Sequence, residues 1–179
     1  MTKKKIEIEK AIFAGGCFWC MIPPFENIDG VLEVVPGYIG GKTKNPSYEA
    51  VSTGKTGYLE SVQIIYDPKK VKYRALLETF WKQIDPEDFG GQFADRGSQY
   101  KTAIFYHSKE QKEKALKSKQ KIEKMKKFKE IATEIKKAST FYVAEPYHKD
   151  YHKKYPLQYK AYKKMSGRED FIKRTWGSK

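Results

Sequence analysis

The sequence has only two cysteines, Cys17 and Cys20, and they lie three positions apart directly after a glycine pair. Glycines permit a tight turn at low steric cost, and the apolar residues before them predict a strand. The residues after them predict a helix, in which Pro23 and Pro24 are tolerated only in the first turn. Free backbone N–H groups and the dipole at a helix N-terminus favour a thiolate. We therefore expect Cys17 to be an accessible nucleophile and not a small buried hydrophobic residue.

The elements that must position this segment follow from hydrophobic periodicity. Alternation over residues 60–66 predicts a strand, and helical spacing over residues 73–84 predicts a helix that Asp85-Pro86 ends. Ser108 followed by Gln111 predicts a capped start of a lysine-rich helix. Its expected buried stripe is Ala115, Ser118, Ile122 and Met125. Further strands are predicted in segments 6–14, 30–36, 100–106, 131–135 and 141–144, with Pro36-Gly37 closing the second.

The remaining segments are predicted to be loops and a C-terminal wrap. Residues 37–57 and 89–97 are rich in turn-forming residues. Beyond residue 146, tyrosines recur every three or four positions, and Pro156 interrupts any continuous helix, so we interpret them as packing residues. Ser166 with Glu169 is expected to cap a last short helix. The whole pattern predicts one α+β domain over residues 1–179, a ferredoxin-like two-layer sandwich with a mixed sheet and a coil-rich C-terminal wrap.

Composition limits the function classes. The chain has 179 residues and a net charge of +14, and its excess of basic residues is mostly lysine spread along the whole sequence. Such a charge permits nucleic-acid contact, but no interleaved aromatic and basic motif supports it. No apolar stretch is long enough to span a membrane, and no leader segment is recognisable. We expect a cytoplasmic monomer without a cofactor, a metal, or a nucleic-acid or membrane partner.

Four segments together resemble the A-type peptide-methionine sulfoxide reductases. They are Gly15-Gly16-Cys17-Phe18-Trp19, Asn45-Pro46-Ser47-Tyr48-Glu49, Asp95-Arg96-Gly97-Ser98-Gln99-Tyr100 and Phe141-Tyr142-Val143-Ala144-Glu145-Pro146-Tyr147-His148. The cysteine motif alone is moderately specific. The four matches occur in the order of the family and extend over most of the chain, so the resemblance is strong.

The resemblance implies that Cys17 attacks the sulfur of methionine S-sulfoxide, free or in proteins, and becomes a sulfenic acid. It implies that Phe18 and Trp19 form the wall around the substrate methyl group. It also implies that Glu60, Tyr48 and Tyr100 hold and protonate the sulfoxide oxygen, and that Asp95 and His148 hold the substrate backbone. Thioredoxin or another thiol reductant would then regenerate the enzyme.

General chemistry agrees with these implied roles. A sulfoxide oxygen leaves only after it is protonated, so an acid must lie beside it. An apolar neighbourhood that contains Phe18 and Trp19 would raise the pKa of Glu60 and keep it protonated near neutral pH. Tyrosine hydroxyls are neutral donors suited to the same oxygen. Taken singly, Glu60 would be interpreted as a surface carboxylate and the tyrosines as packing residues.

Two departures from the family pattern matter. Tyr58 stands two residues before Glu60, where the family commonly has histidine. The family often has resolving cysteines near the C-terminus, and this chain has none there. Cys20 is therefore the only internal candidate to resolve the Cys17 sulfenic acid, and direct reduction by an external thiol is the alternative.

Two other functions use the same residues. A thioredoxin-like dithiol oxidoreductase would explain Cys17 and Cys20 but not the acid and the tyrosines. A zinc site would combine both cysteines with His148 and His152, although 127 residues separate Cys20 from His148, far more than in compact zinc fingers.

Overall fold

The structure, a computed structural model, describes residues 7–177 and is built on a six-stranded sheet in the order β7-β6-β1-β3-β2-β8. Its strands are β1 (Glu9–Gly15), β2 (Val31–Ile39), β3 (Leu59–Tyr66), β6 (Thr102–Tyr106), β7 (Glu134–Lys137) and β8 (Tyr142–Val143). Neighbouring strands are antiparallel, except that β6 and β7 are parallel. The sheet is therefore mixed, as predicted.

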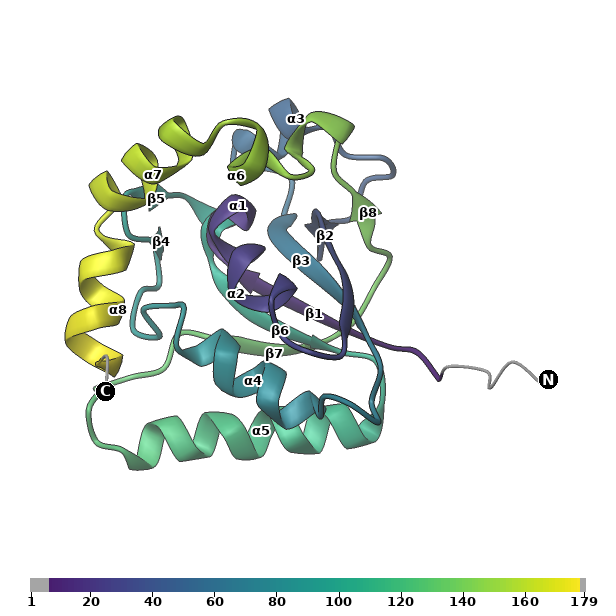
Figure 1. Ribbon diagram of the computed structural model, residues 1–179, viewed down its shortest axis with the longest axis vertical. Coiled ribbons are helices and arrows are strands. Elements are labelled where there is room, and N and C mark those ends of the chain that lie inside the picture. Colours follow the sequence, from purple (N-terminus) through teal and green to yellow (C-terminus); the bar gives the residue numbers. More distant parts are fainter. Residues whose placement is uncertain (1–6, 178–179) are drawn as a thin grey trace.

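The helices between the strands create the expected ferredoxin-like core. The chain runs from β1 through α1 (Phe18–Met21) and α2 (Pro23–Glu26) to β2 and β3, and then through α4 (Tyr73–Trp81) to β6. With the spatial order β6-β1-β3-β2, this is the split βαβ arrangement. Figure 1 shows α1, α2 and α4 in front of the sheet and α5 (Lys109–Lys124) along its lower edge. The prediction of an α+β fold is confirmed.

The central strand β1 is buried on both faces. Ala11 and Phe13 belong to the larger core under the helices, where the Phe13 ring stacks on Phe25 and Phe80. Ile12, which alternates with them, belongs to a smaller cluster on the opposite face. The connection from β7 to β8 joins the two edges of the sheet, and its Phe141 packs against that smaller cluster. The Cys17 segment thus follows a strand that is buried on both faces.

Several predicted strand boundaries are wrong, and contacts with distant segments explain the largest difference. Strand β2 continues through Pro36 to Ile39, because Pro36 pairs opposite Val62 and Gly37 opposite both Ser61 and Val143. A side chain at Gly37 would collide with the Phe141 ring, so glycine here permits close approach and does not end the strand. The first strand begins at Glu9, and Ile6 lies outside the described residues.

Two helices also differ from expectation. Residues 37–57 contain α3 (Tyr48–Ser52), which begins because the Ser47 hydroxyl accepts a hydrogen bond from Ala50 N. Ser108 caps α5 through Gln111 N as predicted. The expected buried stripe of α5 ends early, because Met125 lies just after the helix and is 50% exposed.

The C-terminal segment is more helical than the predicted coil-rich wrap. It contains α6 (Tyr151–Lys154), α7 (Pro156–Met165) and α8 (Arg168–Trp176), which pass over the top and left of the view in Figure 1. Pro156 separates α6 from α7, as predicted, but it also starts α7, because proline at the first helical position loses no hydrogen bond. Ser166 does not cap α8; Gly167 occupies the N-cap position.

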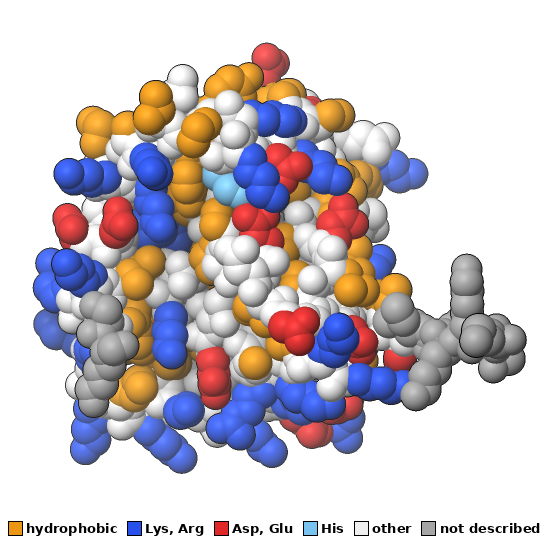
Figure 2. Space-filling view, viewed as in Figure 1, with side chains coloured by type: hydrophobic (Ala, Val, Ile, Leu, Met, Phe, Trp, Pro, Cys, Tyr) orange, Lys and Arg blue, Asp and Glu red, His pale blue; other side chains and the backbone are white. Residues whose placement is uncertain are grey.

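The visible surface is strongly basic. Figure 2 shows lysine and arginine side chains over much of this face, with many along the lower edge where α5 lies. Among residues 7–177, no helix is both long and apolar enough to cross a membrane.

Candidate active site

The two cysteines lie at the start of α1, below the C-terminal helices. Cys17 is the N-cap residue of α1, and its carbonyl accepts a hydrogen bond from Cys20 N at 3.1 Å. Gly16 before it has φ +85°, and a Cβ there would lie 2.6 Å from the Cβ of Gln92, so this position requires glycine. Both cysteines are free thiols.

The expectation of an accessible Cys17 thiolate is wrong in this structure. Cys17 is only 5% exposed, because α7 covers it and Tyr159 packs against both cysteines. Burial raises the pKa of the Cys17 thiol well above its usual value, and the charges of Glu60 and Asp95 act in the same direction. Helix α1 has only four residues, so its dipole cannot offset these effects. Cys17 therefore rests as a thiol.

Cys20 shows the opposite tendency. Its side chain is also buried. The neighbouring Cys17 lowers the pKa of Cys20, and the positive charge of Arg168 adds to this, while burial opposes it. Of the two sulfur atoms, Cys20 is the one whose surroundings favour the thiolate.

Glu60 lies on β3 directly behind the cysteine motif. Its carboxyl accepts a hydrogen bond from Phe18 N at 3.1 Å, and the side chain is buried. Burial raises the pKa of Glu60 to about 8, although the hydrogen bond from Phe18 opposes the shift. This agrees with the expected protonated carboxyl. At pH 7 most of the Glu60 population carries a proton beside the Cys17 loop.

Tyr48 and Tyr100 come from separate elements and reach the same site. Tyr48 is the first residue of α3, and Tyr100 ends the short 3₁₀ turn Ser98–Tyr100. Burial raises the pKa of Tyr48 to about 12 and raises that of Tyr100 further, and the charges of Glu60 and Cys17 contribute to both shifts. Both hydroxyls are therefore neutral donors near Glu60 and Cys17.

Phe18, Trp19 and His148 form one aromatic group. The Trp19 Nε1–H donates to His148 Nδ1 at 3.1 Å, and the Phe18 and His148 rings are 4.9 Å apart. Burial lowers the pKa of His148, so this imidazole is neutral and carries its proton on Nε2. That buried Nε2 has no hydrogen-bond partner among the described residues.

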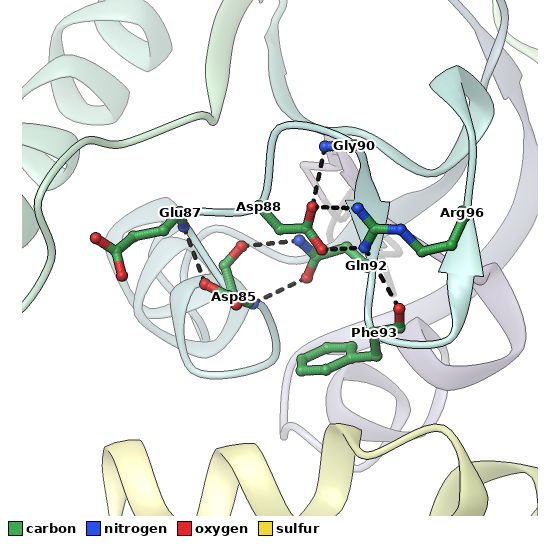
Figure 3. Close-up of polar contacts among 7 residues, drawn as sticks. All are labelled: Asp85, Glu87, Asp88, Gly90, Gln92, Phe93 and Arg96. Atoms are coloured by element: carbon green, nitrogen blue, oxygen red, sulfur yellow. Dashed lines mark hydrogen bonds and ion pairs between the residues drawn. The ribbon is translucent and has the colours of Figure 1, made fainter.

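Asp95 is held at the site by a rigid loop. Figure 3 shows Arg96 paired with Asp88 and the Gln92 amide bonded to the backbone of Asp85, at 2.9 Å from N and 2.8 Å from O. The strands β4 (Gly91–Gln92) and β5 (Asp95–Arg96) close this loop. Burial raises the pKa of Asp95, although a hydrogen bond from Tyr162 opposes the shift.

Sequence reasoning missed several residues that complete the site. The Tyr151 ring stacks on Trp19 with centroids 3.9 Å apart, and Tyr162 bonds Asp95, so the C-terminal tyrosines pack on the site itself. Glu145 accepts hydrogen bonds from Tyr48 N and from the Tyr38 hydroxyl, both at 3.0 Å. Glu145 lies within one of the four segments, which was the only available signal.

Tyr58, which stands where the family commonly has histidine, does not touch the acid. It is buried, and its hydroxyl donates to the carbonyl of Thr43. Its ring also meets Tyr142 edge-on. Tyr58 therefore secures the loop before α3, and Glu60 is supported instead by Phe18 N.

The histidines proposed for a zinc site have other partners. His148 is bonded to Trp19, and His152 lies 2.8 Å from a Glu26 oxygen. Within the part of the chain that the structure describes, no three His, Cys, Asp or Glu side chains are grouped to hold a metal ion.

Comparisons with known proteins agree with the geometry. A family model described as peptide methionine sulfoxide reductase matches residues 9–179. The peptide methionine sulfoxide reductase MsrA of Bacillus licheniformis is 54% identical over 172 residues, covering 96% of this chain and 95% of that protein. MsrA of Bacillus subtilis is 53% identical over 180 residues, covering 100% of both.

Solved structures show the same relation. Reduced Mxr1 from Saccharomyces cerevisiae superposes with a TM-score of 0.79 at 30% identity, covering 86% of this chain and 92% of that one. Methionine sulfoxide reductase A of Corynebacterium diphtheriae gives a TM-score of 0.76 at 28% identity, covering 88% and 79%. Fold and sequence therefore point to one family.

Proposed function

Because the chain belongs to the peptide methionine sulfoxide reductase family, we propose that the site around Cys17 reduces the S epimer of methionine sulfoxide. The observation that carries this proposal is the buried Glu60 carboxyl, whose pKa is raised to about 8 and which is hydrogen-bonded to the residue after Cys17. A sulfur nucleophile next to a protonated acid suits sulfoxide reduction and is not needed for disulfide exchange.

In the first step, the sulfur of Cys17 attacks the sulfoxide sulfur while Glu60 gives its proton to the sulfoxide oxygen. The S–O bond of the substrate and the transient bond between the two sulfur atoms then break, the oxygen becomes bonded to Cys17 as a sulfenic acid, and the substrate sulfur keeps the electron pair and leaves as the thioether of methionine. The Cys17 thiol proton returns to Glu60, so the acid is restored. Tyr48 and Tyr100 donate hydrogen bonds to the oxygen, since burial keeps both hydroxyls neutral.

The substrate is held by the aromatic group and by Asp95. Phe18 and Trp19 supply the apolar wall for the methyl group. The Nε2–H of His148 has no partner among the described residues and is a donor for a substrate backbone carbonyl. Asp95, which lies on β5 opposite Gln92, accepts from a substrate N–H. A protein-bound substrate presents an amide carbonyl and an amide N–H, and free methionine sulfoxide presents a carboxylate oxygen and an ammonium N–H in their place.

In the second step, the Cys20 thiolate attacks the Cys17 sulfenic acid. A bond forms between the two sulfur atoms, the S–O bond breaks, and the released hydroxide takes up a proton to become water. Thioredoxin or another thiol reductant then reduces the disulfide. A structure of Mxr1 from Saccharomyces cerevisiae in complex with Trx2 shows that Mxr1 binds Trx2. We place this cycle in the cytoplasm, where thiols stay reduced, and expect a monomer.

The proposal predicts strict stereochemistry. Purified protein with a dithiol should reduce methionine S-sulfoxide and leave the R epimer unchanged, because separate enzymes serve the two epimers. Chromatographic separation of the epimers measures both rates. The variant Cys17→Ser should abolish reduction, while insulin disulfide should remain intact with the wild type. Equal turnover of both epimers, or activity in Cys17→Ser, would contradict the proposal.

A further inference from the structure

Arg168 is a buried arginine that the proposed cycle does not use. It is the first residue of α8, is only 1% exposed, and is the largest fully buried side chain among the described residues. Removing a guanidinium from water is costly unless a carboxylate neutralises it. Its presence deep in the fold therefore needs an explanation.

The partners of Arg168 are all uncharged. Its Nη2 donates to the carbonyl of Gly15 at 2.9 Å, and its Nη1 donates to that of Gln83 at 2.7 Å. The guanidinium also lies 4.8 Å from the centre of the Phe93 ring. Within residues 7–177, no carboxylate lies within ion-pair distance of it. The guanidinium therefore has hydrogen-bond and ring contacts but no ion-pair partner among these residues, and Asp95 is a more distant carboxylate that its charge acts on.

This charge lies against the turn that carries both cysteines. Gly15 ends β1, and a Cβ added to Gly16 would lie 2.9 Å from Arg168 Nη2. The Nη1 is 3.7 Å from the sulfur of Met21, the residue after Cys20. The guanidinium thus contacts the chain on both sides of the cysteine pair.

The ionisable groups that face Cys20 come from several elements. They are Cys17, Glu60 on β3, Asp95 on β5, Tyr159, Tyr162 and Lys163 on α7, and Arg168 on α8. Lys163 and Arg168 are the cations of this set, and Asp95 and Glu60 oppose them when ionised. Arg168 is the only one of the two cations that is buried, so its field is screened least.

We propose that Arg168 is a positioning residue for the second half of the cycle, since its charge, which has no ion-pair partner among residues 7–177, favours the Cys20 thiolate while its hydrogen bond to Gly15 holds the cysteine turn. The inference rests on the proposed resolving role of Cys20. It also gives a reason for the hydrogen bond that joins Arg168, the first residue of α8, to Gly15. The thiolate of Cys20 attacks the Cys17 sulfur, and the oxygen leaves as hydroxide, which takes up a proton to become water.

The test measures how fast iodoacetamide alkylates Cys20 between pH 6 and 10, with each cysteine quantified by peptide mass spectrometry. In Arg168→Met we expect Cys20 alkylation at pH 7 to fall about tenfold, with the profile displaced to higher pH, because one pKa unit changes the thiolate fraction about tenfold. Arg168→Lys keeps the charge and should recover part of the rate. Arg174→Met, on the exposed face of the same helix, is the matched control and should equal the wild type.

Each variant is compared with the wild type only where circular dichroism shows the wild-type fold. If Arg168→Met unfolds, a folded Arg168→Lys should keep most of the wild-type Cys20 profile, and its displacement by about one pH unit would overturn the electrostatic role. An unchanged Cys20 profile in a folded Arg168→Met, or an equal loss in Arg168→Lys and Arg168→Met, would overturn the electrostatic role. A merely structural role would not displace the pH profile.

A second measurement separates this inference from the proposed function. Reduced protein receives excess methionine S-sulfoxide without reductant, and the loss of free thiols is followed at pH 7 and pH 9. Wild type should form the Cys17–Cys20 disulfide, Cys20→Ser should accumulate a trappable sulfenic acid, and Arg168→Met should form the disulfide slowly at pH 7 but near the wild-type rate at pH 9. A wild type that retains free Cys20 overturns the resolving role; normal disulfide rates in Arg168→Met overturn only the role of Arg168.

Discussion

At the level of single residues, the site gives its two cysteines different protonation states, although the two thiols would titrate alike in an exposed peptide. Burial raises the pKa of Glu60 to about 8 and raises that of the Cys17 thiol, so both carry protons at neutral pH. The surroundings of Cys20 favour its thiolate. The group that meets the sulfoxide first is therefore protonated and paired with an acid, and the group that acts second is ready to attack.

The variant Glu60→Gln tests the acid directly. Glutamine keeps the shape and can still accept from Phe18 N, but it has no proton to give at neutral pH. We expect methionine formation in a single turnover to fall by roughly a hundredfold or more, the usual scale of general acid catalysis. Rapid-quench measurement before recycling isolates this step.

The pH dependence gives an independent check. Because Glu60 must be protonated, the wild-type single-turnover rate should decline as pH rises through about 8, and the slow rate of Glu60→Gln should lack this decline. Glu49→Gln, an exposed glutamate beside Tyr48, is the matched control and should behave as the wild type. Wild-type rates in Glu60→Gln would show that another group protonates the oxygen.

At the level of elements, local patterns predicted most of the sheet but few of its boundaries. Alternation located β3 and helical spacing located α4, because each buries a continuous apolar face. Pro36-Gly37 suggested the end of a strand, yet β2 continues, since pairing with Val62 and close contact with Phe141 decide that region. Contacts between distant segments of this kind leave no local signal.

The C-terminal helices illustrate the same limit at the site. Tyr151, Tyr159 and Tyr162 are packing residues as predicted, whereas Tyr147 and Tyr155 are 55% and 48% exposed, so the prediction is wrong for these two. The spacing also did not show that the packed tyrosines lie on Cys17 and Trp19. The Tyr151 ring covers the face of Trp19, and His152 is paired with Glu26 of α2. Helix α6 therefore covers the apolar wall expected to receive the substrate methyl group.

This arrangement predicts that α6 limits access to Cys17. Tyr151→Ala removes the ring that stacks on Trp19, so α6 should open more often and Cys17 should react faster with a neutral alkylating reagent, by roughly threefold or more. Leu157→Ala, at a 78% exposed position in the same segment, should leave the rate unchanged. Equal alkylation of Cys17 in Tyr151→Ala and wild type would show that α6 does not control access.

At the level of the whole molecule, the site is assembled from the entire chain. Cys17 follows β1, Glu60 lies on β3, Tyr100 precedes β6, and His148 lies in a 3₁₀ turn after β8. The resemblance identified these residues because the family pattern has the same residue types at the corresponding positions. The burial of Cys17 and the position of Arg168 depend on how residues 149–176 fold back, and these residues lie outside the four segments that resemble the family.

Placing a carboxyl deep in this assembly must cost stability at neutral and alkaline pH. The pKa of Glu60 is raised from 4.5 to about 8, so its contribution to folding is fully present below about 4.5 and is lost as pH rises through about 8. One pKa unit corresponds to about 1.4 kcal/mol, which sets an upper limit of about 5 kcal/mol for this loss.

The variant Glu60→Gln should therefore be more stable than the wild type, and by an amount that depends on pH. Because glutamine does not ionise, its advantage in free energy of unfolding should be small near pH 4.5 and grow towards pH 8, reaching roughly 1–3 kcal/mol after allowance for relaxation around a buried charge. Urea unfolding at several pH values measures it, with Glu49→Gln as the exposed control. A difference between Glu60→Gln and wild type that stays constant from pH 5 to 8.5 would mean that Glu60 is ionised throughout this range in the folded protein, and the acid role would then fail together with the stability argument.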